Sequence, residues 1–173
     1  AVFGSPLVMG DIDDGLLVEK VVAEYEVDSC IHFAALKAVG ESEARPLAYY
    51  DVNVGGAIAL AEVMGEAGVA TLVFSSSASV YGQPDYLPVT EDAPLRPHSV
   101  YGRTKRVVED FLRDLAHANA NWRIAVLRYF NPAGAHPSGR IGEAPTDRPN
   151  NLVPLLCRVA SGDYSSLAIY GTD

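Results

Sequence analysis

Short apolar runs bounded by turn residues alternate along this chain with longer segments of helical period. The apolar runs are residues 7–9, 30–34, 71–75, 124–129 and 167–170. Parallel strands need a long crossover connection, and a helix usually supplies it. The alternation therefore predicts an α/β fold in which helices cover a parallel sheet.

Three segments between these runs carry apolar residues on one helical face: 13–25, 46–68, and the segment that begins after Ser99, a candidate N-cap. Pro46 and Gly68 suit the start and the end of the second helix. In the third helix Tyr101 and Lys105 lie on the inward face. The inward stripe predicted for the second helix is Leu47, Tyr50, Val54, Ile58, Ala61 and Met64.

A hydroxyl at a strand end stands upstream of a Tyr and a Lys that are one helical turn apart. These residues are Ser77, Tyr101 and Lys105, and Ser75 and Ser76 are expected to complete the strand. A neighbouring ammonium stabilises a phenolate, so we expect Lys105 to lower the pKa of Tyr101 toward a working range for proton transfer. Taken alone the spacing is weak: Tyr101 packed on the sheet, Lys105 snorkelling past it and a Ser in a turn also explain it.

Longer motifs around these residues make the pattern specific. They are IHFAALKAVGES at 31–42, FSSSASVYG at 74–82, RYFNPAGAHPSGRIGE at 128–143 and PNNLVP at 149–154. The order strand, Ser, loop, Tyr-x-x-x-Lys resembles the short-chain dehydrogenase/reductase superfamily. The motifs resemble its UDP-glucose 4-epimerase (UDP-galactose 4-epimerase) family over essentially all 173 residues.

This resemblance implies a doubly wound, Rossmann-like sheet, bound NAD, and Ser77, Tyr101 and Lys105 as catalytic residues. It implies the interconversion of UDP-glucose and UDP-galactose by oxidation at C4, rotation of the keto-sugar and re-reduction. It also implies a homodimer for the full-length protein.

The resemblance also assigns binding residues. Alternatives remain for several of them: Asp11 as the start of a surface turn, Lys37 as a solvated side chain, and Asn151 as a helix cap. Asn53 is also expected to support the backbone of the site. The cofactor contacts are Asp11, Ile12, Phe33, Ala34, Ala35, Lys37, Asn53 and Phe130. The substrate contacts are Ser77, Tyr101, Asn131, Asn151, Leu152, Ala168 and Tyr170.

Other functions on the same fold make different demands on these positions. Related 4,6-dehydratases carry an acid and a base where this chain has Ala78 and Ser79, so residue type disfavours elimination of water. An epimerase of another UDP-sugar, an N-acetylhexosamine or a uronic acid, stays open. A non-catalytic nucleotide-binding protein would be expected to have lost Tyr101 or Lys105, and both are present.

The chain is expected to be an internal fragment, truncated at both ends. It opens at Ala1 without the glycine-rich strand-to-helix turn of a dinucleotide fold, and it stops at Asp173 just after an apolar run. We assign residues 1–130 to a partial NAD-binding domain and residues 131–173 to the start of the nucleotide-sugar-binding region. The second begins with a long Pro- and Gly-rich loop. Without the first βαβ unit, we expect the isolated chain to be inactive.

The net charge and the cysteine content disfavour several classes of binding partner and metal site. A net charge of −9 disfavours a nucleic-acid surface, and no apolar run has the length of a membrane span. Cys30 and Cys157 lack metal-ligand spacing, so we predict no metal site and two reduced thiols in a cytoplasmic protein.

Overall fold

The structure is a computed structural model that describes residues 4–142 and 151–169. The chain divides into two compact units, Ala1–Phe130 and Asn131–Asp173. The first unit holds the sheet and helices α1 to α5, and the described part of the second holds helix α6 (Leu152–Ala160). Which ligand each unit serves stays a prediction.

Three parallel strands form the sheet of the first unit. β1 (Cys30–His32), β2 (Thr71–Ser77) and β3 (Arg123–Tyr129) lie in the order β1-β2-β3, with β2 in the centre. β2 pairs His32 with Phe74 on one side and Ser77 with Tyr129 on the other. The carboxyl ends of all three strands therefore lie at one edge of the sheet, where ligands bind in folds of this class.

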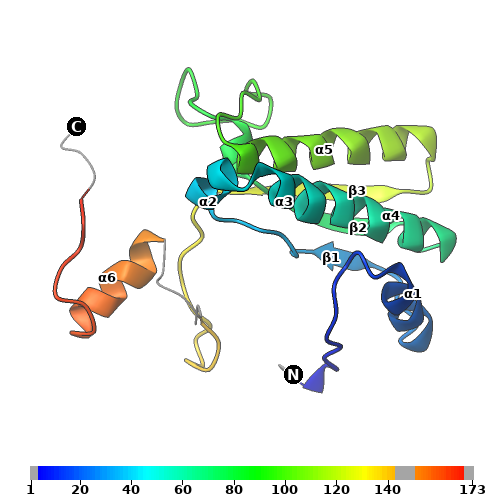
Figure 1. Cartoon of the computed structure of the whole chain (residues 1–173), viewed down its shortest axis with the longest axis horizontal. Helices are drawn as coiled ribbons and strands as arrows, with labels where there is room; N and C mark the ends of the chain where they lie inside the picture. Colours follow the sequence, from blue (N-terminus) through cyan, green and yellow to red (C-terminus); the bar gives the residue numbers. More distant parts are fainter. Residues whose placement is uncertain (1–3, 143–150, 170–173) are drawn as a thin grey trace. The chain divides into compact units, whose positions relative to one another are not determined.

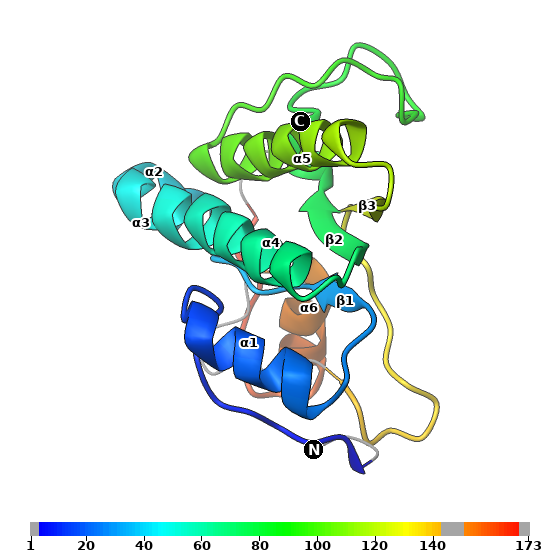
Figure 2. The same ribbon diagram turned by 90° about the vertical axis from the view of Figure 1, so that its right-hand side faces the viewer.

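The helices α1, α4 and α5 lie along one face of this sheet (Figures 1 and 2). A π-helical turn, Asp51–Gly55, joins α3 to α4, and a 3₁₀ turn, Ala78–Val80, follows β2. None of the described helices has the length and apolarity needed to cross a bilayer. The helix bounds are α1 Gly15–Glu24, α2 Val39–Ala44, α3 Pro46–Tyr50, α4 Gly56–Glu66 and α5 Val100–Ala118.

The core lies between the central strand and helices α4 and α5. Leu72 and Phe74 of β2 pack with Met64 of α4 and with Val108 and Leu112 of α5, and all five are almost fully buried. Burial of such side chains contributes about 1.5–3 kcal/mol each and fixes α5 over the sheet.

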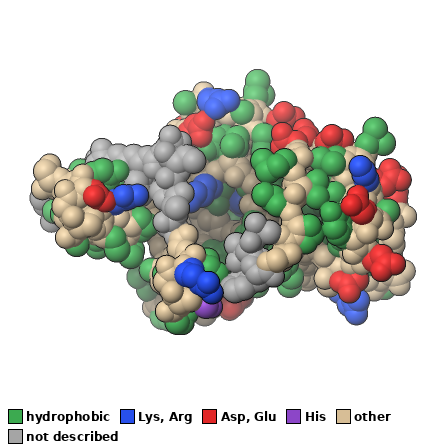
Figure 3. Space-filling model, turned by 90° about the horizontal axis from the view of Figure 1, so that it is seen from below, with side chains coloured by type: hydrophobic (Ala, Val, Ile, Leu, Met, Phe, Trp, Pro, Cys, Tyr) green, Lys and Arg blue, Asp and Glu red, His purple; other side chains and the backbone are tan. Residues whose placement is uncertain are grey.

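On the surface that Figure 3 views, hydrophobic side chains are exposed among acidic ones.

Two predicted strands are wrong. Residues 7–9 are irregular, and Leu7 and Met9 are 72% and 80% exposed. A strand needs a neighbour for its backbone groups, and no described strand pairs with this segment. Residues 167–169 are also irregular, and Tyr170 lies outside the described residues.

Two other predicted elements differ in extent. β1 ends at His32 rather than at residue 34, and the backbone of Leu36 bonds the Asn53 side chain instead of a strand. The predicted helix 46–68 is interrupted by the π-helical turn, which inserts an extra residue and changes the helical phase. Leu47, Tyr50 and Ile58, which were predicted to face inward, are exposed, and Tyr49 is buried instead. Ala61 and Met64 are buried as predicted.

Candidate active site

Ser77 and Tyr101 come from two elements that pack closely. Ser77 ends β2; its Oγ accepts a hydrogen bond from the Ser79 backbone N–H (3.1 Å) and donates to Ser79 Oγ (3.2 Å). Tyr101 lies in the first turn of α5, next to Gly102. A Cβ on Gly102 would lie 2.7 Å from the carbonyl oxygen of Ser79, so glycine permits this approach of α5 to the turn that follows Ser77.

The half-buried hydroxyl of Tyr101 sits beside Ser77. Burial raises the pKa of Tyr101, and a hydrogen bond with the Ser77 hydroxyl partly offsets that rise. The expectation that Lys105 would lower the pKa of Tyr101 in this chain is therefore wrong, because desolvation of the phenolate outweighs other effects. The group that favours the phenolate here is Ser77.

Lys105 is 4% exposed, so its side chain does not snorkel to solvent. Its Nζ donates to the carbonyl oxygen of Ser75 (2.9 Å) and lies 4.9 Å from the ring centroid of Phe74 and 5.9 Å from that of Tyr101. Burial lowers the pKa of Lys105 to about 8. The ammonium is thus held next to Tyr101 with little competing solvent.

His32 of β1 is the neighbouring titratable group. It is buried, its ring centroid lies 5.7 Å from that of Phe74, and its pKa is lowered to about 4 by burial and by the charge of Lys105. His32 is neutral near pH 7 and leaves Lys105 as the buried cation on this side.

Asn53 joins the loop after β1 to α5. Its Oδ1 accepts from the Leu36 N–H (2.8 Å), and its Nδ2 donates to the Leu36 carbonyl (3.0 Å) and to Thr104 Oγ1 (3.1 Å). Thr104 in turn donates to the carbonyl oxygen of Tyr101 (2.8 Å). These contacts fit the expected support of the site backbone, and direct contact of Asn53 with a cofactor stays a prediction.

Helix α2 holds the start of α5, a role that sequence reasoning missed. Ser42 Oγ accepts from the backbone N–H of Tyr101 (3.1 Å), and Glu43 Oε1 accepts from that of Val100 (2.7 Å). Ser99 accepts from Gly102 N–H (3.0 Å), which confirms the predicted cap. Three of the N–H groups that a helix start leaves unpaired are thereby satisfied. Ser42, the last residue of the motif at 31–42, and Glu43 directly after it were the available signal.

The residues predicted to bind a dinucleotide lie at the carboxyl edge of the sheet. Phe33 is exposed, its ring centroid lies 6.5 Å from that of Tyr129, and exposed Ala34 and Lys37 share its loop. Phe130 is exposed and stacks on Tyr81, with centroids 6.3 Å apart. Exposed aromatic rings beside small residues at this edge are compatible with a flat ring, and folds of this class bind dinucleotides at the same edge. Ala35 is half-buried in the same loop.

The other two predicted cofactor residues precede α1. Asp11 is exposed, and its carbonyl accepts from Asp14 N–H (3.3 Å), so it does begin a turn. Ile12 is half-buried and packs against Gly56 at the start of α4, where a Cβ would lie 2.9 Å from its side chain. Their contact with adenine stays a prediction.

In the second unit the predicted substrate residues Asn131, Asn151, Leu152 and Ala168 are all exposed. Asn151 occupies the N-cap position of α6, but its side chain makes no capping hydrogen bond, which leaves its amide available to a ligand. Residues 131–142 are irregular, as expected for this loop.

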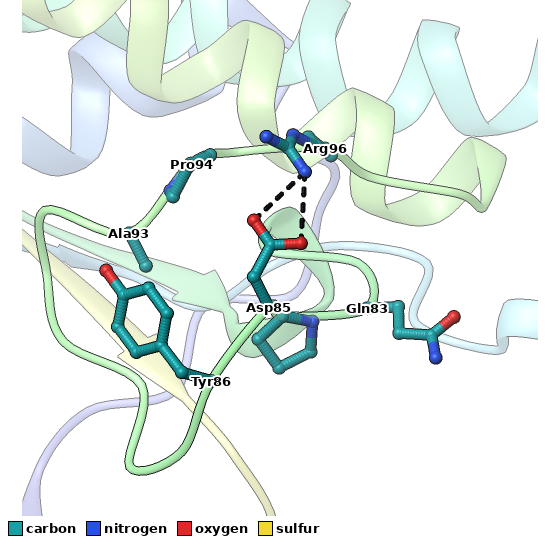
Figure 4. A pocket seen from close by; sticks show the side chains of 7 residues that line it. Gln83, Asp85, Tyr86, Ala93, Pro94 and Arg96 are labelled. Carbon is teal, nitrogen blue, oxygen red and sulfur yellow. Dashed lines mark hydrogen bonds and ion pairs between the residues drawn. The ribbon is translucent and has the colours of Figure 1, made fainter.

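A small pocket lies in the loop after the site, with an empty volume of about 240 Å³ (Figure 4). Asp85 and Arg96 form an exposed ion pair at 3.2 Å on its wall. No predicted site residue lines this pocket. Within residues 4–142 and 151–169, no three His, Cys, Asp or Glu side chains are placed to hold a metal ion.

Comparison with known proteins agrees with this geometry. Residues 2–173 match the NAD dependent epimerase/dehydratase family, and the chain belongs to it. UDP-glucose 4-epimerase from Neisseria meningitidis serogroup A is 53% identical over 169 residues, which are 97% of this chain and 50% of that protein. The chain therefore spans about half the length of this curated relative.

Solved structures give the same result. UDP-glucose 4-epimerase from Bifidobacterium longum, in complex with NAD+ and UDP, has a TM-score of 0.92 and 46% identity over 98% of this chain and 52% of that one. The enzyme from Stenotrophomonas maltophila, with bound NAD and formylated UDP-arabinopyranose, has a TM-score of 0.90 and 49% identity over 95% and 49%. The predicted resemblance and the parallel, Rossmann-like fold are confirmed.

Proposed function

We propose that this chain carries the catalytic residues of an NAD-dependent UDP-glucose 4-epimerase, which interconverts UDP-glucose and UDP-galactose. The observation that carries the proposal is the grouping of Ser77, Tyr101 and Lys105 at the carboxyl end of β2. The match to UDP-glucose 4-epimerases along almost the whole chain supports the choice of reaction.

The proton chemistry belongs to Tyr101. Its phenolate oxygen accepts the proton of the sugar 4-hydroxyl, and the tyrosine hydroxyl so formed later returns that proton, while Ser77 holds the reacting oxygen by a hydrogen bond. Lys105 places a buried ammonium beside this ring, with its Nζ 5.9 Å from the Tyr101 ring centroid. Bound NAD would supply a reversible hydride acceptor for C4. Phe33, Ala34, Ala35, Lys37 and Phe130 would hold it, together with Asp11, Ile12 and the support of Asn53.

The substrate is a UDP-sugar, bound through Asn131, Asn151, Leu152, Ala168 and Tyr170. Asn151 at the start of α6 suits a diphosphate, since helix N-termini favour anions. Epimerisation of a UDP-N-acetylhexosamine or a UDP-uronic acid is the nearest alternative. Comparing turnover of these sugars with that of UDP-glucose separates them.

Two further alternatives are weaker. Ser79 hydrogen-bonds Ser77 and Ala78 is apolar, so no carboxylate stands there for a dehydratase. A non-catalytic nucleotide-binding protein has no need for a lysine buried beside a tyrosine.

We place the protein in the cytoplasm, in galactose metabolism, and as a homodimer. Two free thiols support the first, and sedimentation of the full-length protein tests the last.

Replacing Tyr101 with Phe tests the proposal in the full-length protein. The change keeps the ring and removes the proton acceptor, so kcat for UDP-galactose should fall by at least ~10²-fold, measured by a coupled UDP-glucose assay. Tyr86→Phe is the control, because Tyr86 is exposed in the loop after the site and should leave kcat unchanged. Near-normal turnover of Tyr101→Phe would contradict the assignment of Tyr101 as the proton acceptor.

A further inference from the structure

A buried glutamate lies on the same face of α5 as the two candidate catalytic residues. Tyr101, Lys105 and Glu109 are spaced four residues apart, which places them one above the other along the helix. Glu109 is 2% exposed. A carboxylate buried this deeply requires hydrogen-bonded partners.

Those partners come from β2 and β3. Glu109 Oε1 accepts from Ser76 Oγ (2.5 Å) and Arg128 Nε (3.0 Å), and Oε2 accepts from Arg128 Nη2 (2.7 Å). Ser76 and Arg128 face each other in the strand register. The two-pronged ion pair therefore ties α5 to β3, and the hydrogen bond from Ser76 ties α5 to the residue that directly precedes Ser77.

The other end of Arg128 reaches the turn beyond Ser77. Its Nη1 donates to Tyr81 Oη and to the carbonyl of Glu91, both at 3.0 Å, and its guanidinium lies 5.0 Å from the Tyr81 ring centroid. Residues on both sides of Ser77 are thus fixed to one ion pair, Ser76 through Glu109 and Tyr81 through Arg128. The hydrogen bonds that Arg128 donates to Glu109 raise the pKa of Arg128 and keep it charged.

Stability alone does not explain this arrangement. A buried ion pair is often matched or exceeded in stability by apolar residues of similar volume. Charge-assisted, two-pronged hydrogen bonds instead fix the relative orientation of the two side chains, because both bonds form only in one mutual geometry. The geometry they hold here is the position of the β2 end relative to α5.

We propose that Glu109 and Arg128 are positioning residues that hold Ser77 against the Tyr101 hydroxyl. This inference rests on the proposed function for its effect on turnover. The variants below leave Lys105, whose Nζ lies 5.9 Å from the Tyr101 ring centroid, and Glu43, which accepts from the Val100 N–H, unchanged. A Ser77 that has moved away no longer favours the phenolate, so the pKa of Tyr101 rises.

The test replaces the network by apolar residues in the full-length protein: Ser76→Ala, Glu109→Leu and Arg128→Met together. The thermal midpoint should change little. We expect kcat to fall roughly 10- to 100-fold with KM nearly unchanged, the size of loss that a small misplacement causes. Arg113→Met is the matched control, because it removes an exposed ion pair with Asp110 from the same helix.

Two readouts separate positioning from a merely structural role. In a Ser77→Ala background the triple replacement should lower kcat by less than about twofold further, because its effect passes through Ser77. Absorbance titration of each protein against its Tyr101→Phe counterpart should show a higher Tyr101 pKa in the triple variant. Multiplicative losses of kcat or an unmoved Tyr101 pKa would overturn the proposal.

Arg128→Lys covers the case in which the triple variant does not fold. It keeps the charge beside Glu109 and removes the two-pronged contact, so the same loss of kcat and the same rise in the Tyr101 pKa are expected. Unchanged values for this variant would also refute the inference. The titration needs no turnover, so an inactive wild type would reject the proposed function while this test still decides the positioning role.

Discussion

Gly102→Ala perturbs the junction between Ser77 and Tyr101 without touching either side chain. The new Cβ would lie 2.7 Å from the Ser79 carbonyl oxygen, 3.2 Å from its carbonyl carbon and 3.1 Å from Pro97 Cβ. An ordinary contact begins at 3.4 Å, so the methyl group is about 0.7 Å too close to a backbone atom. Either α5 or the turn after Ser77 has to move.

Two effects on stability oppose each other. Overpacking costs about 1–3 kcal/mol, and alanine regains about 1 kcal/mol of helix propensity over glycine. The net loss is therefore about 0–2 kcal/mol, a fall in Tm of at most about 8 °C for a domain of this size. A displacement of several tenths of an ångström between Ser77 and Tyr101 should lower kcat roughly 10- to 100-fold.

Turnover and thermal melting of the full-length protein measure both effects, and Gly65→Ala is the matched control. In α4 its Cβ would lie 3.7 Å from Trp122, an ordinary contact, so this change should stabilise by up to about 1 kcal/mol and leave kcat unchanged. If Gly102→Ala turned over as fast as wild type, the close approach of α5 to the turn would have no part in catalysis.

Three further predictions concern buried polar groups. Asn53→Ala should lower the free energy of unfolding by about 2–4 kcal/mol in urea titration, because Leu36 and Thr104 lose partners; wild-type stability would contradict this. Because the pKa of His32 is lowered to about 4, the unfolded state binds more protons between pH 6.5 and 4. Wild type should lose a few kcal/mol there on acidification, and His32→Gln should lose less; equal losses would refute this. Because the pKa of Lys105 is lowered to about 8, wild type should gain stability relative to Lys105→Met as pH rises from about 8 to about 10.4, and a constant difference would disprove this.

The sequence predicted the strands that form β1, β2 and β3, their parallel arrangement and the capped helix α5, because each has a strong period and clear end signals. It did not predict the π-helical turn. Leu47 and Tyr49 are both suited to the buried face of a helix, and tertiary packing, which the local pattern does not give, decides which of them is buried. Residues 7–9 have strand composition without a described partner, and composition alone does not form hydrogen bonds.

For the candidate site, the spacing of Tyr101 and Lys105 was readable, but the direction of the Tyr101 pKa was not. That direction depends on burial, which no local pattern gives. Glu109 was readable in principle: a charge four residues after Lys105 on an apolar helix face is a signal for a buried partner. Its partner Arg128 is distant in sequence and was identified from the structure.

The π-helical turn Asp51–Gly55 has a consequence for how this segment tolerates change in length. Each residue of an α-helix turns the chain by about 100°, so deleting one residue here would make the helix regular and rotate α3 by that angle. Tyr49 Oη would then leave its hydrogen bonds to the Ala38 carbonyl (2.8 Å) and Glu41 (3.1 Å). A single deletion that improves the local helix would therefore detach the loop after β1, whereas a substitution that keeps the residue count would leave it attached.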